Sequence, residues 1–583
     1  MKPGRISTSL LLACAVSFPA LADEKEELLK LKNTTLNLID LLVQQGILDK
    51  TKAEQMVKQA EQKAAQEARA ETQAEESAAK AEAQQAGKPA TSKGQSPVRV
   101  TYVPDFVKNE IRDQVRKELR AEVVNDVKAQ AKDEKWGIPA ALPDWLNSFR
   151  FFGDMRLRYE DDFFGDNNLE NTYIDFPRVN RSGGFTRTDN PFRNTTVDRI
   201  RYRMRLRLGL EAQIADHLKA GIRLATSNDR SPISINQTLG QNGQQYELAL
   251  DRAFLKYDYV DDKGREWLNL WGGRFANPWL STDNLFDPDM NMEGFTAAFH
   301  LPIGSGGSSY PVPNPVGRQQ MNVGVSKPNQ IFLTVGAFPL QEVELSSHDK
   351  WMWAAQSGLD WVFADTTRLR AGVGYYDYKN ITARPNALGS RINDWTAPLF
   401  FTKGNSLAQI SNETDPSLEP RLVGLASDFD IVDAIVSVDY GGFGANHVML
   451  TGNYSDNLGF DRREILQRTG QNLKEHTRAY QIRFDVGRPD LTKFGDWQLW
   501  LAYKYLESDS VLDAFTDSNF HLSGTNAKGW MLGVNYGLTR NTWLNARWLT
   551  AKAIDENRKG LLAGGGAGPF DVDVLLVDLN ARF

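Results

Sequence analysis

Residues 199–214, with the sequence RIRYRMRLRLGLEAQI, alternate between charged and apolar side chains. Successive side chains of a β-strand point to opposite faces, so this pattern predicts a strand with one wet face and one apolar face. The apolar face would carry Ile200, Tyr202, Met204, Leu206, Leu208 and Leu210, and the wet face Arg199, Arg201, Arg203, Arg205 and Arg207. Taken alone, the segment also fits a soluble sandwich with a solvated arginine face.

Similar alternation recurs along the chain in segments of about ten residues, the length that a tilted strand needs to cross a bilayer. Fifteen further segments show it: 149–159, 217–228, 246–259, 266–275, 293–301, 330–338, 352–363, 366–378, 423–439, 445–455, 477–487, 495–507, 528–538, 541–551 and 571–583. The sequence therefore predicts an all-β transmembrane barrel of about 16 antiparallel strands over residues 145–583.

Composition and connection lengths agree with a barrel. A hydrophobic content of 41% and a mean hydropathy of −0.46 exclude a bundle of transmembrane helices. Long links alternate with short ones such as 215–216 and 539–540, as in outer-membrane barrels. Residues 302–329 break this rule, either because a strand is hidden near 322–326 or because the link carries an insertion, and an even strand count favours the insertion.

The region before the barrel is predicted to have four parts. Residues 1–22 form a signal peptide, with cleavage after Ala20-Leu21-Ala22, although the sequence before Cys14 also resembles a lipoprotein cleavage box. Residues 23–86 follow as a helical, coiled-coil-like region and 87–104 as a linker. A helix over 105–136 has an apolar face that favours self-association, formed by Val107, Ile111, Val115, Leu119, Val123 and Val127.

Charge and cysteine usage narrow the functional classes. The formal net charge is −6, so no overall basic character points to nucleic acid. Cys14 is the only cysteine, which leaves a mature chain without thiolate metal ligands or a cysteine nucleophile. None of the six histidines lies in an H-E-x-x-H zinc pattern. The sequence implies no cofactor and no metal.

The last strand has its own signature. Leu575, Val577, Leu579 and Phe583 share one face, and the chain ends on an aromatic residue. This resembles the C-terminal signal that outer-membrane barrels present to the barrel-assembly machinery. We expect the strand to pair with the segment near Phe149 and close the ring.

Several segments together resemble a family of proteobacterial porins known as the Putative porin family. They are VRVTYVPDFVKNEIRDQVRKE, FRFFGDMRLRYE and WGGRFANPWLSTDNLFDPDMNMEGF, together with the helical N-terminal region. The resemblance implies a β-barrel porin in lipid of the outer membrane, with the N-terminal region in the periplasm. Because general porins are commonly trimeric, it also implies a homo-oligomer.

Strand parity then predicts a basic wall inside the barrel. Charges on the lipid face cost roughly 2–4 kcal/mol, so charged positions are expected to face the lumen. The predicted pore-lining residues are Arg150, Arg156, Arg158, Arg199, Arg201, Arg203, Arg205, Arg207, Lys219, Arg223, Arg252 and Lys256.

The third long link supplies the opposite charge. It contains Asp283, Asp287 and Asp289, with Glu293 at its end. In general diffusion porins the third loop folds into the barrel and opposes an arginine cluster, and the resemblance implies a similar constriction here. A loop that is acidic for solubility, or that binds divalent cations, is the alternative interpretation.

The function expected from these features is passive diffusion of small hydrophilic solutes or ions through a water-filled channel, with a weak preference for anions. Two other functions fit less of the sequence. The barrel could anchor a structural tether formed by the N-terminal region, or it could be a hydrolase using His348-Asp349. No G-x-S-x-G nucleophile motif supports an enzyme.

Overall fold

The computed structural model describes residues 148–583, except 183–187, 228–230, 304–328, 345–346, 364–365, 413, 415–421 and 557–567. The predictions for residues 1–136 lie outside the described residues. Within the described part, no helix is long and apolar enough to cross a membrane.

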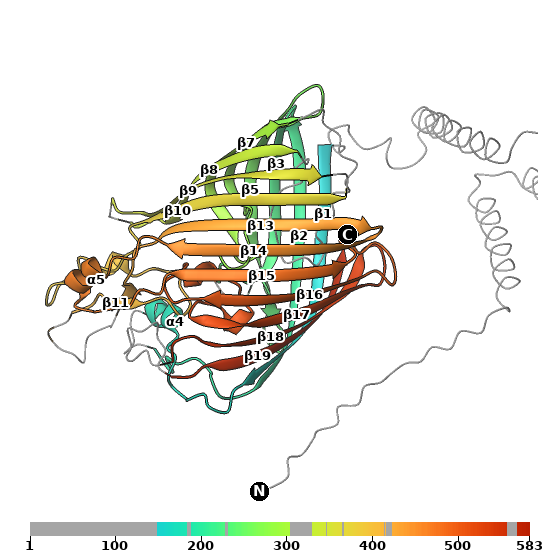
Figure 1. Cartoon of the computed structure of the whole chain (residues 1–583). Helices are drawn as coiled ribbons and strands as arrows, with labels where there is room; N and C mark the ends of the chain where they lie inside the picture. The colour runs from blue at the N-terminus through green and yellow to red at the C-terminus, as the bar shows by residue number, and fades with distance from the viewer. Residues whose placement is uncertain are drawn as a thin grey trace, which may run out of the picture. The chain divides into compact units, whose positions relative to one another are not determined.

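Sixteen long antiparallel strands form a closed ring (Figure 1). They are β1 (Phe149–Phe164), β2 (Arg199–Ala215), β3 (Leu218–Ser227), β5 (Glu247–Val260), β6 (Glu266–Ala276), β7 (Asn291–Pro302), β8 (Gln330–Gln341), β9 (Lys350–Phe363), β10 (Thr367–Lys379), β13 (Asp430–Phe443), β14 (Asn446–Asn457), β15 (Arg478–Gly487), β16 (Trp497–Leu506), β17 (Ala527–Gly537), β18 (Thr542–Ala553) and β19 (Asp571–Arg582). This confirms the predicted 16-stranded antiparallel barrel.

The last strand closes the ring as expected. β19 pairs with β1 in a register that sets Ala581 opposite Met155. Phe583 and Gly153 then exchange two backbone hydrogen bonds of 3.0 and 2.9 Å. The predicted assembly residues Leu575, Val577, Leu579 and Phe583 share the parity of the outward face, on which Val577 and Leu579 are exposed.

Side chains alternate between the two faces of each strand. On β2, Ile200 and Tyr202 are about 60% exposed, whereas Arg205 is only 6% exposed. Large apolar residues are also exposed on the outward face of the other strands, as a surface in contact with lipid requires.

One predicted strand was wrong in extent. The segment 423–439 is divided into β12 (Val423–Leu425), which pairs with β11 (Leu407–Gln409) outside the ring, and β13, which starts at Asp430. The backbone turns between them, where the Asp428 carboxylate accepts the Phe429 amide at 3.0 Å. Local side-chain hydrogen bonding of this kind competes with strand pairing.

The connections between strands are long at one end of the barrel and mostly short at the other. The helices α4 (Phe176–Arg181) and α5 (Arg462–Thr469) and the β11 strand lie at the end with long loops, opposite the C-terminus (Figure 1). At the other end β7 pairs directly with β8, with Pro302 opposite Gln330, so no barrel strand separates them. This agrees with the insertion that we favoured for residues 302–329.

Candidate channel and its two cavities

The loop between β6 and β7, residues 277–290, crosses the barrel interior; we call it the third loop. Leu280 exchanges two 2.8 Å hydrogen bonds with the Gln356 side chain of β9. Farther along, Thr282 donates to Asn453 of β14 at 2.8 Å, and Asp283 lies 2.8 Å from the Lys504 ammonium of β16. The loop is therefore tied to β9, and across the barrel to β14 and β16.

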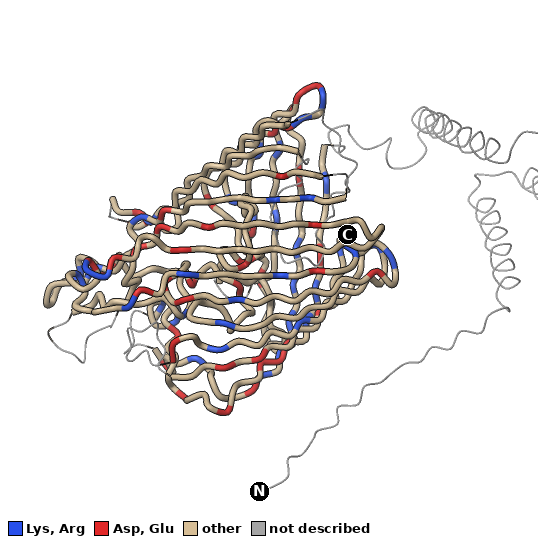
Figure 2. Tube along the Cα trace, in the orientation of Figure 1, with Lys and Arg blue, Asp and Glu red and all other residues tan. Residues whose placement is uncertain are grey.

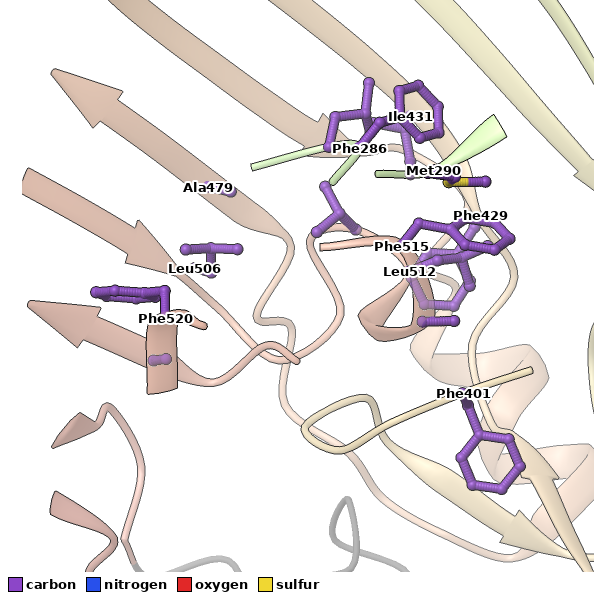
Figure 3. Packing of buried hydrophobic residues seen from close by; sticks show 14 of the residues in the cluster. Phe286, Met290, Phe401, Phe429, Ile431, Ala479, Leu506, Leu512, Phe515 and Phe520 are labelled. Carbon is purple, nitrogen blue, oxygen red and sulfur yellow. The ribbon is translucent and has the colours of Figure 1, made fainter. Parts of the chain in front are cut away.

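The third loop meets the loop between β16 and β17, residues 507–526, which we call the seventh loop. The Asp287 amide donates to the Phe515 carbonyl at 2.6 Å, and the Ser518 amide donates to the Asp287 carboxylate at 2.8 Å. Phe286 packs against Phe515 with ring centres 6.5 Å apart, within the apolar cluster shown in Figure 3. The seventh loop also carries the short helices η5 (Asp513–Phe515) and η6 (Phe520–Leu522). Together the two loops occupy part of the barrel interior, and open space remains beside β1, β2, β18 and β19.

The arginines of β1 and β2 line that open space. Figure 2 shows acidic positions among the basic ones in this part of the barrel. Arg158 donates to both Asp578 oxygens at 2.6 and 2.9 Å, and Arg156 donates to Asn580 at 3.1 Å. On the neighbouring strand Arg201 and Arg203 both pair with Glu160. The basic wall is thus a network of ion pairs.

Our sequence analysis missed the acidic half of this network. Asp154, Glu160 and Asp162 have the same strand parity as Arg156 and Arg158, so the first strand already contained the signal. Asp578 has the inward parity of the last strand, but only the β19–β1 register places it beside Arg158, because Arg158 lies directly opposite Asp578.

Four of the predicted basic residues lie apart from this wall. Arg223 pairs with Asp251, Lys256 and Lys219 lie 2.7 and 3.8 Å from Asp258, and Arg252 donates to Asn291 at 2.7 Å. A register shift at Arg223/Leu224 marks a bulge that turns both Asp251 and Arg252 inward. None of the four lines either cavity described below.

The predicted acidic set is divided by the structure. Asp289 faces the wall, 3.1 Å from Arg205 and 3.8 Å from Arg207. Asp283 and Asp287 are buried where the third loop contacts the opposite wall and the seventh loop. Grouping Glu293 with them was wrong: it belongs to β7, shares the outward parity of Phe295 and pairs with Arg274 of β6.

Burial and neighbouring charges act differently on the two loop carboxylates. Burial, together with the negative charges of Asp289 and Asp517, raises the pKa of Asp287 well above its usual range. Burial also opposes ionisation of Asp289, but the guanidinium groups of the wall, led by Arg205, outweigh it and lower the pKa of Asp289 to about 2. Asp289 therefore carries the negative charge that faces the arginines.

Two cavities follow the arginine wall. The inner cavity, of about 660 Å³, extends toward the short-turn end and is lined by Arg150, Asp154, Arg156, Arg158, Arg205, Arg207, Asp287, Asp289, Arg547, Asp578, Asn580 and Phe583, among others. The outer cavity, of about 470 Å³, lies toward the long loops. Ser518 lines both cavities, and the neighbouring Asn519 accepts a 3.0 Å hydrogen bond from Arg158. The contact between the seventh loop and β1 thus narrows the interior between the two cavities.

A closed 16-stranded ring with an apolar outside and charged cavities inside defines an outer-membrane β-barrel channel of the porin type. The chain belongs to the Putative porin family, whose model matches residues 32–583. Porins are channels and not enzymes, and this protein is accordingly non-enzymatic. Among the residues that the structure describes, no group of three or more His, Cys, Asp or Glu side chains could hold a metal ion.

Solved porin structures resemble the chain at low sequence identity. The high-pH structure of Pseudomonas putida OprB is 14% identical, with a TM-score of 0.41, over 77% of this chain and 97% of that one. An anion-selective porin from Comamonas acidovorans is 12% identical, with a TM-score of 0.36, over 75% and 99%. Salmonella typhi OmpF in complex with daunomycin is 11% identical, with a TM-score of 0.37, over 75% and 97%. No curated protein sequence matches the chain.

Proposed function

We propose that the protein is a passive diffusion channel for small hydrophilic solutes, with a weak preference for anions. The observation that carries the proposal is the excess of arginine in both cavities. Among the residues that the structure describes, seven arginines and four aspartates line the inner cavity, and five arginines, one lysine and three carboxylates line the outer one. A positive wall raises the local concentration of anions.

The acidic residues limit this preference. Asp289 lies against Arg205 and Arg207, and Asp154 accepts from the same two arginines at 2.8 and 2.6 Å. Ion pairs that are already satisfied attract a passing anion less than free guanidinium groups do. The paired charges also create a field across the pore, which orients polar solutes.

Reconstitution in a planar bilayer under a potassium chloride gradient tests the proposal. We expect stepwise conductance and a reversal potential on the anion side. Absence of stepwise conductance would contradict the channel, and a reversal potential on the cation side would contradict the anion preference.

A matched pair of variants tests the role of the wall. Arg207 lines the inner cavity and pairs with Asp154, whereas Arg265 pairs with Asp261 at 2.9 Å in the turn before β6, outside both cavities. We expect Arg207→Gln to shift the reversal potential toward cations and Arg265→Gln to leave it unchanged. Equal shifts in both variants would remove the assignment of Arg207 to the pore.

The proposal also covers the oligomeric state of the protein and its recognition by the barrel-assembly machinery. The four-residue apolar repeat from Val107 to Val127 supports a homotrimer joined through a periplasmic helical region. The apolar outward face of β19, which ends at Phe583, supports recognition by the barrel-assembly machinery. Native mass spectrometry of the detergent-solubilised protein, with and without residues 105–136, tests the trimer; an unchanged trimer after the deletion would exclude this helix as its cause.

A further inference from the structure

The outer cavity has an unusual lining for a channel that passes hydrophilic solutes. Ten of the described residues that line it are apolar, and five of these are phenylalanines. Phe164, Phe192 and Phe400 are only half-buried, so their rings keep surface exposed, and the neighbouring Leu399 is 68% exposed. A water-filled passage needs no such surface, because exposed apolar area in contact with water costs free energy.

The aromatic rings are held in place. Phe164 stacks on Phe570 with ring centres 6.1 Å apart and planes inclined by 15°. Phe400 stacks on Phe515 at 5.5 Å and 20°, which connects it to the apolar cluster of the third and seventh loops. A rigid apolar surface loses little entropy when a ligand binds to it.

The polar groups of the same cavity offer mainly donors. The carboxylates of Glu160 and Asp162 accept from Arg201, and Glu160 accepts from Arg203 as well. Asp175 accepts the backbone amide of Arg178 at the start of α4. Each of these three carboxylates therefore already accepts from an arginine or a backbone amide, and Asp162 Oδ1 is the one of their oxygens that is buried without a hydrogen-bond partner among the described residues.

By contrast, two arginines of the outer cavity, Arg193 and Arg199, have N–H groups without a hydrogen-bond partner among the described residues. Arg199 forms no ion pair with any residue that the structure describes. Arg193 donates from Nη2 to the Thr402 carbonyl at 3.1 Å, and the same atom lies 3.8 Å from the Asp175 carboxylate. Its Nε has no hydrogen-bond partner among the described residues. Guanidinium groups bind carboxylates through paired N–H donors.

We propose that the outer cavity is a binding site for small aromatic monocarboxylates, with the carboxylate held by Arg193 and Arg199 and the ring placed against Phe192 and Phe400. This deepens the proposed function, because it names the solute class that the channel would collect. A volume of about 470 Å³ is in the range of small-molecule sites. A neutral sugar fits the lining less well, since its hydroxyl groups need free acceptors as well as donors.

Equilibrium binding to the detergent-solubilised full chain tests the site without requiring conduction. Benzoate, acetate, benzyl alcohol and glucose are titrated separately and followed by isothermal titration calorimetry. Removing about half of the surface of a phenyl ring from water raises the binding affinity roughly tenfold. We therefore expect benzoate to bind about ten times more tightly than acetate. We also expect benzoate to bind more tightly than benzyl alcohol, which lacks the charge, and glucose to bind more weakly than either.

Variants separate the two halves of the site. Phe400→Leu should reduce the ratio of benzoate to acetate affinity, whereas Phe494→Leu, in the exposed turn before β16, should leave the ratio unchanged. Arg193→Gln should weaken benzoate and acetate by a similar factor. Far-UV circular dichroism confirms that each variant keeps its barrel.

The failures of the two proposals are distinguishable. Equal affinity for benzoate and acetate, or tighter binding of glucose, would overturn the aromatic site even if the channel conducts with an anion preference. Tenfold tighter benzoate binding to a protein that shows no stepwise conductance would support the site and overturn the channel.

Discussion

The two cavities lie along one arginine wall but differ in what surrounds the arginines. In the inner cavity the guanidinium groups of Arg158, Arg205 and Arg207 are paired with Asp578, Asp154 and Asp289, so charge is matched with charge. The outer cavity combines its arginines with a group of phenylalanines, and its carboxylates Glu160 and Asp162 are paired with Arg201. In the channel that we propose, a solute entering from the long-loop end therefore meets an apolar surface first and a field of paired charges second.

The largest expected effect is in the inner cavity. Asp578 accepts from Arg158 and lies 3.7 Å from Arg156 and 3.4 Å from Arg547. Asp578→Ala would leave three guanidinium groups without this partner, and the loss of one member of a buried pair costs about 3–5 kcal/mol. We expect the free energy of unfolding, measured by urea titration in detergent, to fall by about this amount.

Asp573→Ala is the matched control for that prediction. Asp573 lies on the same strand with outward parity and forms no ion pair with any residue that the structure describes. Surface substitutions usually change stability by less than about 0.5 kcal/mol. A similar loss of stability in both variants would mean that the paired network of the inner cavity contributes nothing specific.

The next effect concerns the loops that separate the cavities. Lys504 lies 2.8 Å from Asp283 of the third loop and 3.7 Å from Asp517 of the seventh. In Lys504→Met both carboxylates lose their cation, so we expect the loops to detach from the wall and the single-channel conductance to rise. Lys552→Ala, exposed on β18, is the control; unchanged conductance in Lys504→Met would contradict the role of the loops in narrowing the channel.

Much of the barrel was predictable because the lipid imposes a strict rule on each strand. Alternation with period two follows from contact with an apolar solvent on one side, and every residue of a strand carries part of that signal. The same alternation allowed us to predict that the twelve basic residues lie on the inward face of their strands. The break between β12 and β13 was missed because it depends on hydrogen bonds of the Asp428 side chain, which leave no change in periodicity.

The site was less predictable because it depends on contacts between distant segments. The pairing of Arg158 with Asp578 requires the register of the first and last strands. The outer cavity is assembled from loops near residues 164, 193, 400 and 518, and loop docking has no local pattern. Glu293 was misassigned because we grouped it with the loop carboxylates by its position in the sequence, although it was the first residue of the predicted strand 293–301 and shared the parity of the apolar Phe295.

A smaller, pH-dependent effect is expected near the outer cavity. His521 of the seventh loop accepts a hydrogen bond from Lys403 at Nδ1 (2.8 Å) and donates from Nε2 to the Phe570 carbonyl (2.9 Å). Burial and the charge of Lys403 lower the pKa of His521 well below its ordinary value. When the seventh loop is detached from the barrel interior, His521 has its ordinary pKa and takes up a proton below about pH 6.5. When the loop is packed in place, His521 stays neutral at the same pH, so acid favours the detached loop. Docking therefore loses stability as the pH falls.

Proteolysis of the seventh loop at pH 7.5 and at pH 5.0 measures this effect. Burial raises the pKa of Asp513 to about 6, which acts in the opposite direction below that pH. The informative quantity is therefore the difference between wild type and His521→Asn, since Asn tolerates the positive φ of 53° and does not titrate. We expect the larger increase in cleavage at pH 5.0 in wild type; the same increase in both would exclude His521 as the cause.

The central claim is that solutes pass along the arginine wall from one cavity to the other, past Ser518. Cys14 is the only cysteine of the sequence, so Ser518→Cys in a Cys14→Ser background places one thiol at this point. The account predicts that a negatively charged methanethiosulfonate reagent reduces the single-channel conductance, and that it reacts faster than a positively charged reagent of similar size. Conductance that stays unchanged after complete modification of the cysteine would contradict it.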